Sequence, residues 1–217
     1  MQQVKGIKVS LQDRWLLLGT SGMGKTTFAQ KLCDHLLKFY PSAVLYVLDT
    51  GQKGGDFDDY PGIVYQDDAP LAIKKGVQVW RPSINDPRAF DEWFWNILQA
   101  GGPGIVLIDE IASLVKRQGQ DAPPNFQRLM KQGRGKHLCV INCTQEMSPN
   151  PKPILTQTVH VVRFQMGGIE NGYDRRASNL LIRRPGNAPE PAKYAFDYVR
   201  VDEPMPPIRY SGHQAFF

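Results

Sequence analysis

The segment Gly19-Thr20-Ser21-Gly22-Met23-Gly24-Lys25-Thr26 has the residue types and spacing needed to bind a polyphosphate. It matches the pattern G-x-x-x-x-G-K-[ST], in which glycines let backbone N–H groups curl around phosphate oxygens. Lys25 can reach the β- and γ-phosphate oxygens, and the Thr26 hydroxyl can ligate Mg²⁺. A buried strand before the motif and an amphipathic helix after it argue against a chance match. We therefore predict a site for ATP and Mg²⁺ that extends to Thr27.

Two acids, Asp109 and Glu110, follow the apolar run 105–108. In enzymes with such a phosphate loop, the first acid supports the magnesium shell and the second orients the attacking water. We assign these roles to Asp109 and Glu110, with two solvated acids as the alternative. The pair favours hydrolysis over transfer to a small metabolite. Asp49 also ends an apolar run and could support the metal, although an aspartate that starts a turn is the preferred interpretation.

The run 138–145 is an apolar strand whose last residues are polar. Gln145 or Asn142 could contact the γ-phosphate or the attacking water, because a side-chain amide both donates and accepts hydrogen bonds. An ordinary loop position is the alternative for Gln145. Cys139 and Cys143 do not have the spacing of a zinc site and are expected to be small core residues.

The elements that must position these residues alternate along the chain. Helices are predicted from Thr26 to Phe39, from Pro87 to Gly101 and from Pro124 onward. Apolar runs predict strands at 15–18, 44–48, 77–80, 105–108, 138–143 and 159–164. Residues 50–70 read as a loop, and 194–201 as a half-exposed strand. This order predicts an α/β fold with a mostly parallel central sheet flanked by helices.

Composition narrows the class of protein. The 217 residues are 41% hydrophobic and 22% charged, which excludes a disordered polyelectrolyte and a coiled coil. Three cysteines, two of them in apolar runs, favour a reducing compartment. We expect no signal peptide and no membrane span, because no apolar run reaches about 18 residues. One domain over 1–217 is predicted, with a core at about 15–165 and an extension at about 166–217.

Positive charge is concentrated in the second half of the chain. Residues 116–200 hold 14 Lys/Arg against 6 Asp/Glu, which fits contact with a polyanion such as double-stranded DNA. A solvated basic surface is the alternative for each residue. The candidate DNA contacts are Lys116, Arg117, Arg175, Arg176, Arg183 and Arg184.

Three features together resemble a known family. They are the phosphate loop, the run Ile105-Val106-Leu107-Ile108-Asp109-Glu110, and a Gly133-Arg134 pair before a strand ending in Thr144-Gln145. The chain resembles the FtsK–HerA superfamily of DNA-pumping ATPases. Within it, the chain is similar to genome-packaging ATPases of membrane-containing viruses with double jelly-roll capsids, such as tectiviruses. The resemblance covers about 15–165 and implies a RecA/FtsK-like P-loop NTPase fold.

This resemblance also implies site roles. Lys25 and Thr26 would contact phosphate and Mg²⁺, Asp109 would support the metal, and Glu110 would activate water. Gln145 would sense the γ-phosphate. Arg134 would be an arginine finger that reaches the nucleotide of a neighbouring subunit. A solvated or DNA-facing cation is the alternative for Arg134, and Arg128 is the second candidate for the finger.

The implied function is an ATP-hydrolysing double-stranded DNA translocase that packages a viral genome into a preformed capsid. It would act as a ring-shaped homo-oligomer with capsid or vertex proteins as partners, in the host cytoplasm, the virion or both. Chromosome translocases of this superfamily carry a membrane segment, a large N-terminal region and a winged-helix tail. We expect none of these here, which favours a compact viral motor over chromosome segregation. The alternatives are an ATPase for phage assembly, secretion or conjugative DNA transfer, and a nucleotide-gated binding module.

Overall fold

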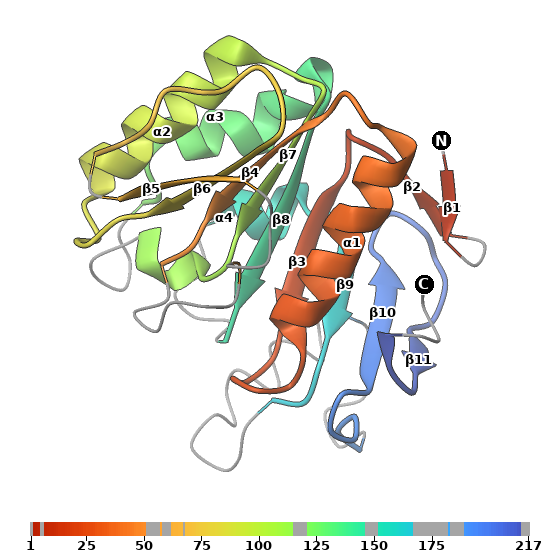
Figure 1. Cartoon of the computed structure of the whole chain (residues 1–217). Helices are drawn as coiled ribbons and strands as arrows, with labels where there is room; N and C mark the ends of the chain where they lie inside the picture. The colour runs from red at the N-terminus through yellow and green to blue at the C-terminus, as the bar shows by residue number, and fades with distance from the viewer. Residues whose placement is uncertain are drawn as a thin grey trace.

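A computed structural model of the chain describes residues 2–4, 7–50, 57, 62–66, 68–114, 121–145, 152–166, 182 and 189–213. Within them, strands and helices alternate over most of the chain (Figure 1). The strands are β1 Gln2–Val4, β2 Ile7–Val9, β3 Arg14–Leu18, β4 Val44–Leu48, β5 Ile63–Gln66, β6 Val77–Arg81, β7 Gly104–Ile108, β8 Leu138–Thr144, β9 His160–Arg163, β10 Phe196–Arg200 and β11 Ile208–Tyr210. The helices are α1 Lys25–Phe39, α2 Pro87–Ala100, α3 Pro124–Gln132 and α4 Lys152–Gln157, with 3₁₀ turns η1 Ile111–Leu114 and η2 Gly133–Lys136.

Nine of the described strands form one sheet in the order β11-β10-β9-β3-β8-β7-β4-β6-β5. Neighbours from β9 to β5 pair in parallel, while β10 is antiparallel to both β9 and β11. The strands β1 and β2 form a separate hairpin. The predicted α/β fold with a mostly parallel sheet is confirmed. Because parallel strands end at one edge, the loops after β3, β7 and β8 meet there.

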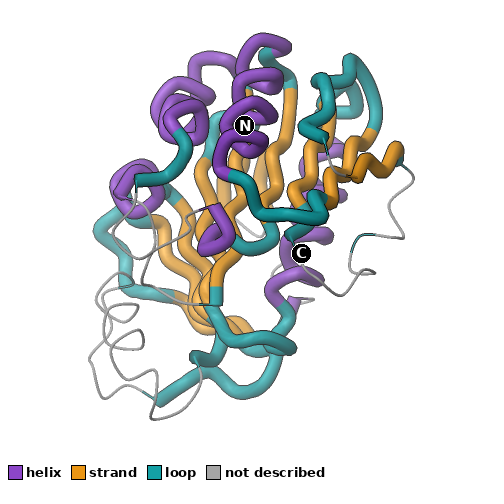
Figure 2. Tube along the Cα trace, turned by 90° about the vertical axis from the view of Figure 1, so that its left-hand side faces the viewer, coloured by secondary structure: helices purple, strands orange, loops and turns teal. Residues whose placement is uncertain are grey.

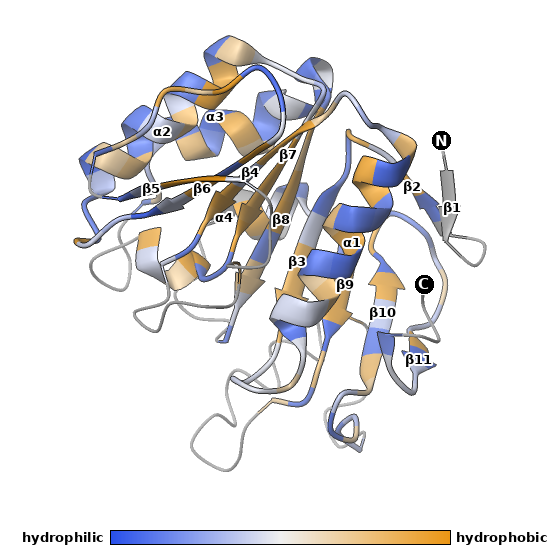
Figure 3. Cartoon of the chain, in the orientation of Figure 1, coloured by the Kyte–Doolittle hydropathy of each residue, from blue (hydrophilic) through white to orange (hydrophobic). Residues whose placement is uncertain are grey.

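Helices cover both faces of the sheet (Figures 1 and 2). Leu16 and Leu18 of β3 pack in the same cluster as the buried residues of α2 and α3. Trp15 and Leu17, which alternate with them, pack with the buried residues of α1. The central strands are therefore apolar on both faces, while hydrophilic residues lie along α1 (Figure 3).

Local sequence signals set the ends of α2 as predicted. The Asp86 side chain accepts a hydrogen bond from the Arg88 N–H at 3.1 Å, and Pro87 is the first helical residue. Gly101, with φ of +71°, follows the last turn. The α2 face that meets the sheet carries Phe90, Trp93 and Phe94, each fully buried. This aromatic stripe belongs to the core.

Two predictions about strands were wrong. Residues 63–66 form the edge strand β5, where a loop was expected. This strand is largely exposed, with only Tyr65 packed on the core, so it has no buried apolar run. The strand at 196–200 was expected to be half exposed, yet its first four residues are buried. Its polar Asp197 is 2% exposed and bonds Arg209 of β11 at 2.7 Å. A sequence-distant partner therefore makes burial of this acid possible.

Candidate functional site

The phosphate-binding motif forms the loop between β3 and α1. Gly22 and Gly24 have φ values of +77° and +96°, a region that side chains with a β-carbon rarely adopt. Gly24 is also the residue before α1, and within the described residues no side chain caps this helix end. The first N–H groups of α1 are therefore available to an anion, which the helix dipole also favours.

The ends of two neighbouring strands hold this loop in place. The Gly19 N–H donates to the Thr144 carbonyl at 3.2 Å, at the end of β8. The Thr20 N–H and hydroxyl both donate to the Gln165 carbonyl, at 3.0 and 3.2 Å, just after β9. The loop is thus fixed to the sheet on both sides of β3.

Lys25 lies inside the loop that precedes it. Its Nζ donates to the carbonyls of Gly19 at 2.6 Å and Thr20 at 3.0 Å, and the residue is 8% exposed. Burial lowers the pKa of the Lys25 ammonium, whereas the nearby charges of Glu110 and Asp109 raise it. The ammonium thus lies between the loop and the two acids, where the terminal phosphates of a nucleotide can reach it.

Thr26 and Asp109 meet at the same edge of the sheet. The Thr26 hydroxyl donates to Oδ1 of Asp109 at 3.4 Å, although the two residues are 83 positions apart. A hydroxyl and a carboxylate oxygen are suitable ligands for Mg²⁺, which uses one or two carboxylates together with substrate phosphates. Among the described residues, no group of three or more His, Cys, Asp and Glu could hold a metal.

Glu110 is held by the segments that follow β7 and β8. Its Oε1 accepts the Ala112 N–H and its Oε2 accepts the Gln145 N–H, both at 3.2 Å. Burial raises the pKa of Glu110, while hydrogen bonds from Ala112, Thr144 and Gln145 and the charge of Lys25 lower it. A carboxylate with a raised pKa is a stronger proton acceptor, which suits a general base.

The structure separates the two amide candidates. Gln145 is exposed, its N–H bonds Glu110, and it directly follows Thr144, whose carbonyl accepts from the Gly19 N–H of the phosphate loop. Asn142 was a wrong candidate. Its Nδ2 donates to the Trp15 carbonyl at 3.3 Å and lies 3.7 Å from the Met130 sulfur, so the side chain is buried against α3.

Asp49 is held by a cation that the sequence analysis did not identify. It is 4% exposed and accepts a hydrogen bond at 2.8 Å from Nε of Arg81, at the end of the neighbouring strand β6. The pairing across strands, visible only in the fold, places this carboxylate against an arginine.

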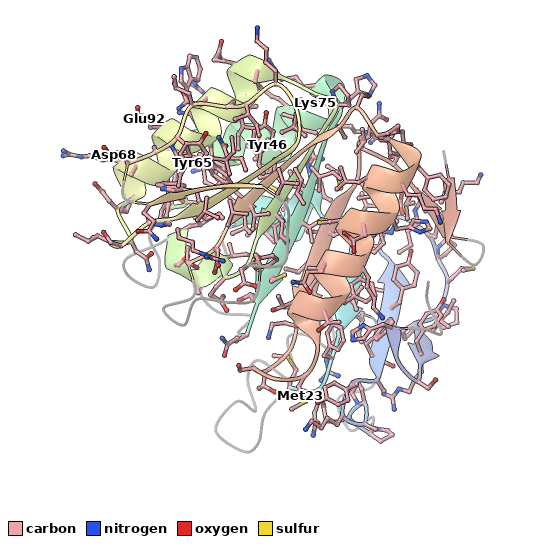
Figure 4. The ribbon with its side chains drawn as sticks, viewed as in Figure 1. Met23, Tyr46, Tyr65, Asp68, Lys75 and Glu92 are labelled. Carbon is pink, nitrogen blue, oxygen red and sulfur yellow. The ribbon has the colours of Figure 1, made fainter. Side chains whose placement is uncertain are left out.

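Arg134 lies in η2, directly before β8. The start of a parallel strand lies at the edge opposite its end, so Arg134 is remote from its own phosphate loop. Figure 4 shows the two ends: Met23 of the loop is at one, and Lys75, just before β6, is at the other. Arg128 donates to Oδ1 of Asn125 at 3.2 Å on its own helix. Of the two candidate fingers, Arg134 is thus positioned away from this chain's own loop.

Arg14 is a buried residue that the sequence analysis missed. Its guanidinium donates to the carbonyls of Leu129 and Met130 at the end of α3, both at 3.2 Å, and of Leu138 at 2.8 Å. A β-carbon at Gly133 would lie 2.9 Å from Nη2 of Arg14. Arg14 therefore fixes the turn that carries Arg134. The sequence signal that could have identified Arg14 is its position directly before the apolar run 15–18, where a charged side chain is buried only if it has partners.

Some predicted residues cannot be placed. The six candidate DNA contacts at 116, 117, 175, 176, 183 and 184 lie outside the described residues. The three cysteines are described, and each is buried and outside any disulfide. Burial was predicted for Cys139 and Cys143.

A model of the AAA family, ATPases associated with various cellular activities, matches residues 15–166. The chain belongs to this family. The part of this ATPase that matches the family model contains the phosphate loop, Asp109 and Glu110. No curated protein sequence matches the chain.

Solved structures share the fold. The DNA-packaging ATPase B204 of Sulfolobus turreted icosahedral virus matches with a TM-score of 0.70 and 13% identity, over 94% of this chain and 99% of that chain. B204 of Sulfolobus turreted icosahedral virus 2, in complex with ATP-γS, matches with a TM-score of 0.72 and 13% identity over the same shares. The pCW3 conjugation coupling protein TcpA, with ATP-γS, matches with a TM-score of 0.65 and 16% identity, over 94% of this ATPase and 62% of TcpA. The fold implied by the sequence resemblance is confirmed.

None of the described helices in this ATPase is long and apolar enough to cross a membrane.

Proposed function

We propose that this ATPase moves double-stranded DNA into a preformed viral capsid. The observation that carries the proposal is the extent of the likeness to B204, a DNA-packaging ATPase, which covers 94% of this chain and 99% of B204. Such a complete overlap supports a shared role more strongly than a match to one part of a larger protein.

In the proposed reaction, water attacks the γ-phosphate of ATP, and ADP and phosphate are released. The Lys25 ammonium neutralises charge on the β- and γ-phosphates, and Glu110 accepts a proton from the attacking water. Gln145, whose N–H bonds the Glu110 carboxylate at 3.2 Å, presents its amide to the γ-phosphate as a sensor. The closeness of Glu110 and Gln145 supports this division of roles.

Thr26 and Asp109 would hold Mg²⁺, in keeping with the 3.4 Å contact between their oxygens. When bound, the ion neutralises charge on the phosphate oxygens. The first N–H groups of α1, from Lys25 to Thr27, donate to the same phosphates, because Gly24 leaves that helix end without a side-chain cap.

We also propose that the motor works as a ring of identical subunits. Arg134 is exposed and lies at the sheet edge opposite its own phosphate loop, which supports contact with a neighbour's nucleotide. The basic region 116–200 would contact the DNA backbone, and capsid or vertex proteins would anchor the ring. The proposed place of action is the host cytoplasm, the virion or both.

Conjugative DNA transfer is a second candidate function. The likeness to TcpA, a conjugation coupling protein, favours it, although the match spans 62% of TcpA. Secretion is a related possibility. All of these candidates would use the same nucleotide site, so the moved substrate distinguishes them.

The test is ATP turnover with linear double-stranded DNA, single-stranded DNA or heparin. Stimulation by duplex DNA alone supports the packaging motor. Stimulation by single-stranded DNA alone would favour conjugative transfer, and equal stimulation by heparin would indicate a general response to polyanions. Turnover that no nucleic acid changes would overturn the DNA-motor proposal. Lys25→Ala serves as the control for a contaminating ATPase.

A further inference from the structure

A cavity of about 530 Å³ lies beside the phosphate loop, on the side remote from the acids. It is lined by Gly24, Thr27, Lys31, Tyr194, Ser211, Gly212 and His213. Two distant parts of the chain therefore build it: the start of α1 and the segment around β10 and β11. The sequence analysis found no motif in this last part.

The orientation of α1 places the cavity relative to the reaction centre. The Thr26 hydroxyl bonds Asp109, so this side of the helix faces the end of β7. Thr27 lies about 100° further around the helix and lines the cavity instead, and Lys31 follows one turn later. A triphosphate with its γ-phosphate at Glu110 and its β-phosphate in the loop would direct its other end toward this cavity.

His213 and Tyr194 form the aromatic wall of the cavity. A β-carbon at Gly24 would lie 2.9 Å from Nε2 of His213 and 3.5 Å from Cδ1 of Tyr194, so both rings reach the loop itself. The His213 ring stacks on Phe196 of β10, with centroids 6.2 Å apart at 26°, and lies 6.0 Å from Phe28 of α1. His213 is thus fixed by the core on one side and by the loop on the other.

Tyr194 is the accessible ring of the two. Tyr194 is 49% exposed. Its backbone has a φ of +67°, which a tyrosine rarely adopts. The Lys193 ammonium lies 5.0 Å from its ring centroid, and Lys31 lines the same cavity. An open aromatic ring among cations, next to a phosphate loop, suits a flat, aromatic and anionic ligand.

We propose that this cavity binds the base and ribose of the nucleoside triphosphate, with Tyr194 as the surface on which the base stacks. The inference rests on the proposed nucleotide site and assigns its second half to residues 194–213. Burial, with the charge of Lys31, lowers the pKa of His213, so a neutral ring at the loop is favoured near neutral pH. Because β10 and β11 lie within residues 194–213, nucleotide binding in this cavity would contact the segment that contains both strands.

Comparing two ligands tests the proposal. The dissociation constants of ATP and of inorganic triphosphate, both with Mg²⁺, are measured for the wild type and for Tyr194→Ala. Loss of a stacked base weakens ATP binding about 10-fold, whereas inorganic triphosphate, which has no base, should bind as before. Tyr194→Phe should keep the wild-type affinity for ATP. Trp95→Ala, which removes a 44% exposed ring from α2, is the matched control and should change neither constant.

The outcomes separate this inference from the nucleotide site itself. Unchanged ATP affinity in Tyr194→Ala would overturn the assignment of the base to this cavity. An equal loss for both ligands would overturn it too, because the change would then act on the phosphate loop. Lys25→Ala should lose both ligands in every case. If it retains both, the proposed phosphate loop has failed, whatever Tyr194 does.

Discussion

The Gln145 N–H donates to Oε2 of Glu110 across 3.2 Å, which joins the ends of β8 and β7 at the phosphate loop. The preceding residue, Thr144, accepts the Gly19 N–H at 3.2 Å. Two consecutive residues at the end of β8 therefore hold the acid and the loop. Any shift of β8 would move the Glu110 carboxylate, the proposed general base, and the phosphate loop together.

Lys25→Ala is expected to abolish ATP turnover while the protein still folds. The Lys25 ammonium donates to two carbonyls of the loop, at 2.6 and 3.0 Å, and it is not part of the apolar core. Turnover is measured by phosphate release, and folding by circular dichroism. Lys38→Ala, an exposed lysine in the last turn of α1, is the control and should hydrolyse ATP at the wild-type rate. Normal hydrolysis in Lys25→Ala would contradict the assignment of the loop.

Glu110→Gln is expected to bind Mg-ATP normally but to hydrolyse it roughly 10²-fold more slowly, the scale of a lost general base. Glutamine keeps the size of the side chain and can still accept one N–H, so binding should survive. Asp109→Ala should instead weaken the magnesium-dependent part of binding. If Glu110→Gln hydrolyses ATP at the wild-type rate, the base is another group, and Gln145→Ala becomes the next variant to measure.

The rate should also depend on pH through Glu110. Burial raises the pKa of Glu110 above its ordinary 4.5, and only the ionised carboxylate can accept a proton. As the pH falls through that raised value, the carboxylate is protonated and the wild-type rate should fall. The ratio of wild-type to Glu110→Gln rates should therefore fall as the pH is lowered, and this fall should already occur at pH values above 4.5. A ratio that stays constant from pH 8 to 4.5 would exclude this role.

Arg134 is expected to act on a neighbouring subunit's nucleotide. An arginine finger contributes about 10³–10⁵ in rate, so Arg134→Ala should bind ATP but hardly hydrolyse it. Mixing Arg134→Ala with Glu110→Gln subunits should restore part of the activity, because some junctions then combine intact Arg134 with intact Glu110. Lys131→Ala, an exposed cation on α3, should retain wild-type activity. If verified mixed rings recover no activity, Arg134 does not act on a neighbour's nucleotide and is a surface or DNA-facing cation instead.

Arg14→Met is expected to destabilise the fold. Three carbonyl groups would lose a buried donor, which costs roughly 2–4 kcal/mol of unfolding free energy. In a chain of this size the melting temperature should fall by roughly 6–12 °C. Arg88→Met, an exposed arginine on α2, should change it little. A melting temperature equal to wild type would show that Arg14 does not fix the turn before β8.

Neighbouring residues determine the local features that the sequence analysis and the structure have in common. The phosphate loop depends on glycines at positions of positive φ and on the helix that follows them, all within eight residues. The buried strands appear as apolar runs because both faces are covered, and Asp86 and Pro87 define the start of α2. The acids at 109–110 could be assigned because a parallel strand brings its end to the edge of the sheet that carries the loop.

Only the tertiary structure decided which side chains meet. Asn142 and Gln145 are three residues apart on β8 and its end, yet one is buried against α3 and the other lies beside Glu110. Strand pairing, which joins segments far apart in the chain, determines such differences, and no local pattern encodes it. The same applies to His213, which lies against Gly24 across 189 positions because β10 and β11 extend the sheet beyond β9. The sequence by itself determined which residues form the loop and the acidic pair, while the pairing of distant strands determined their neighbours.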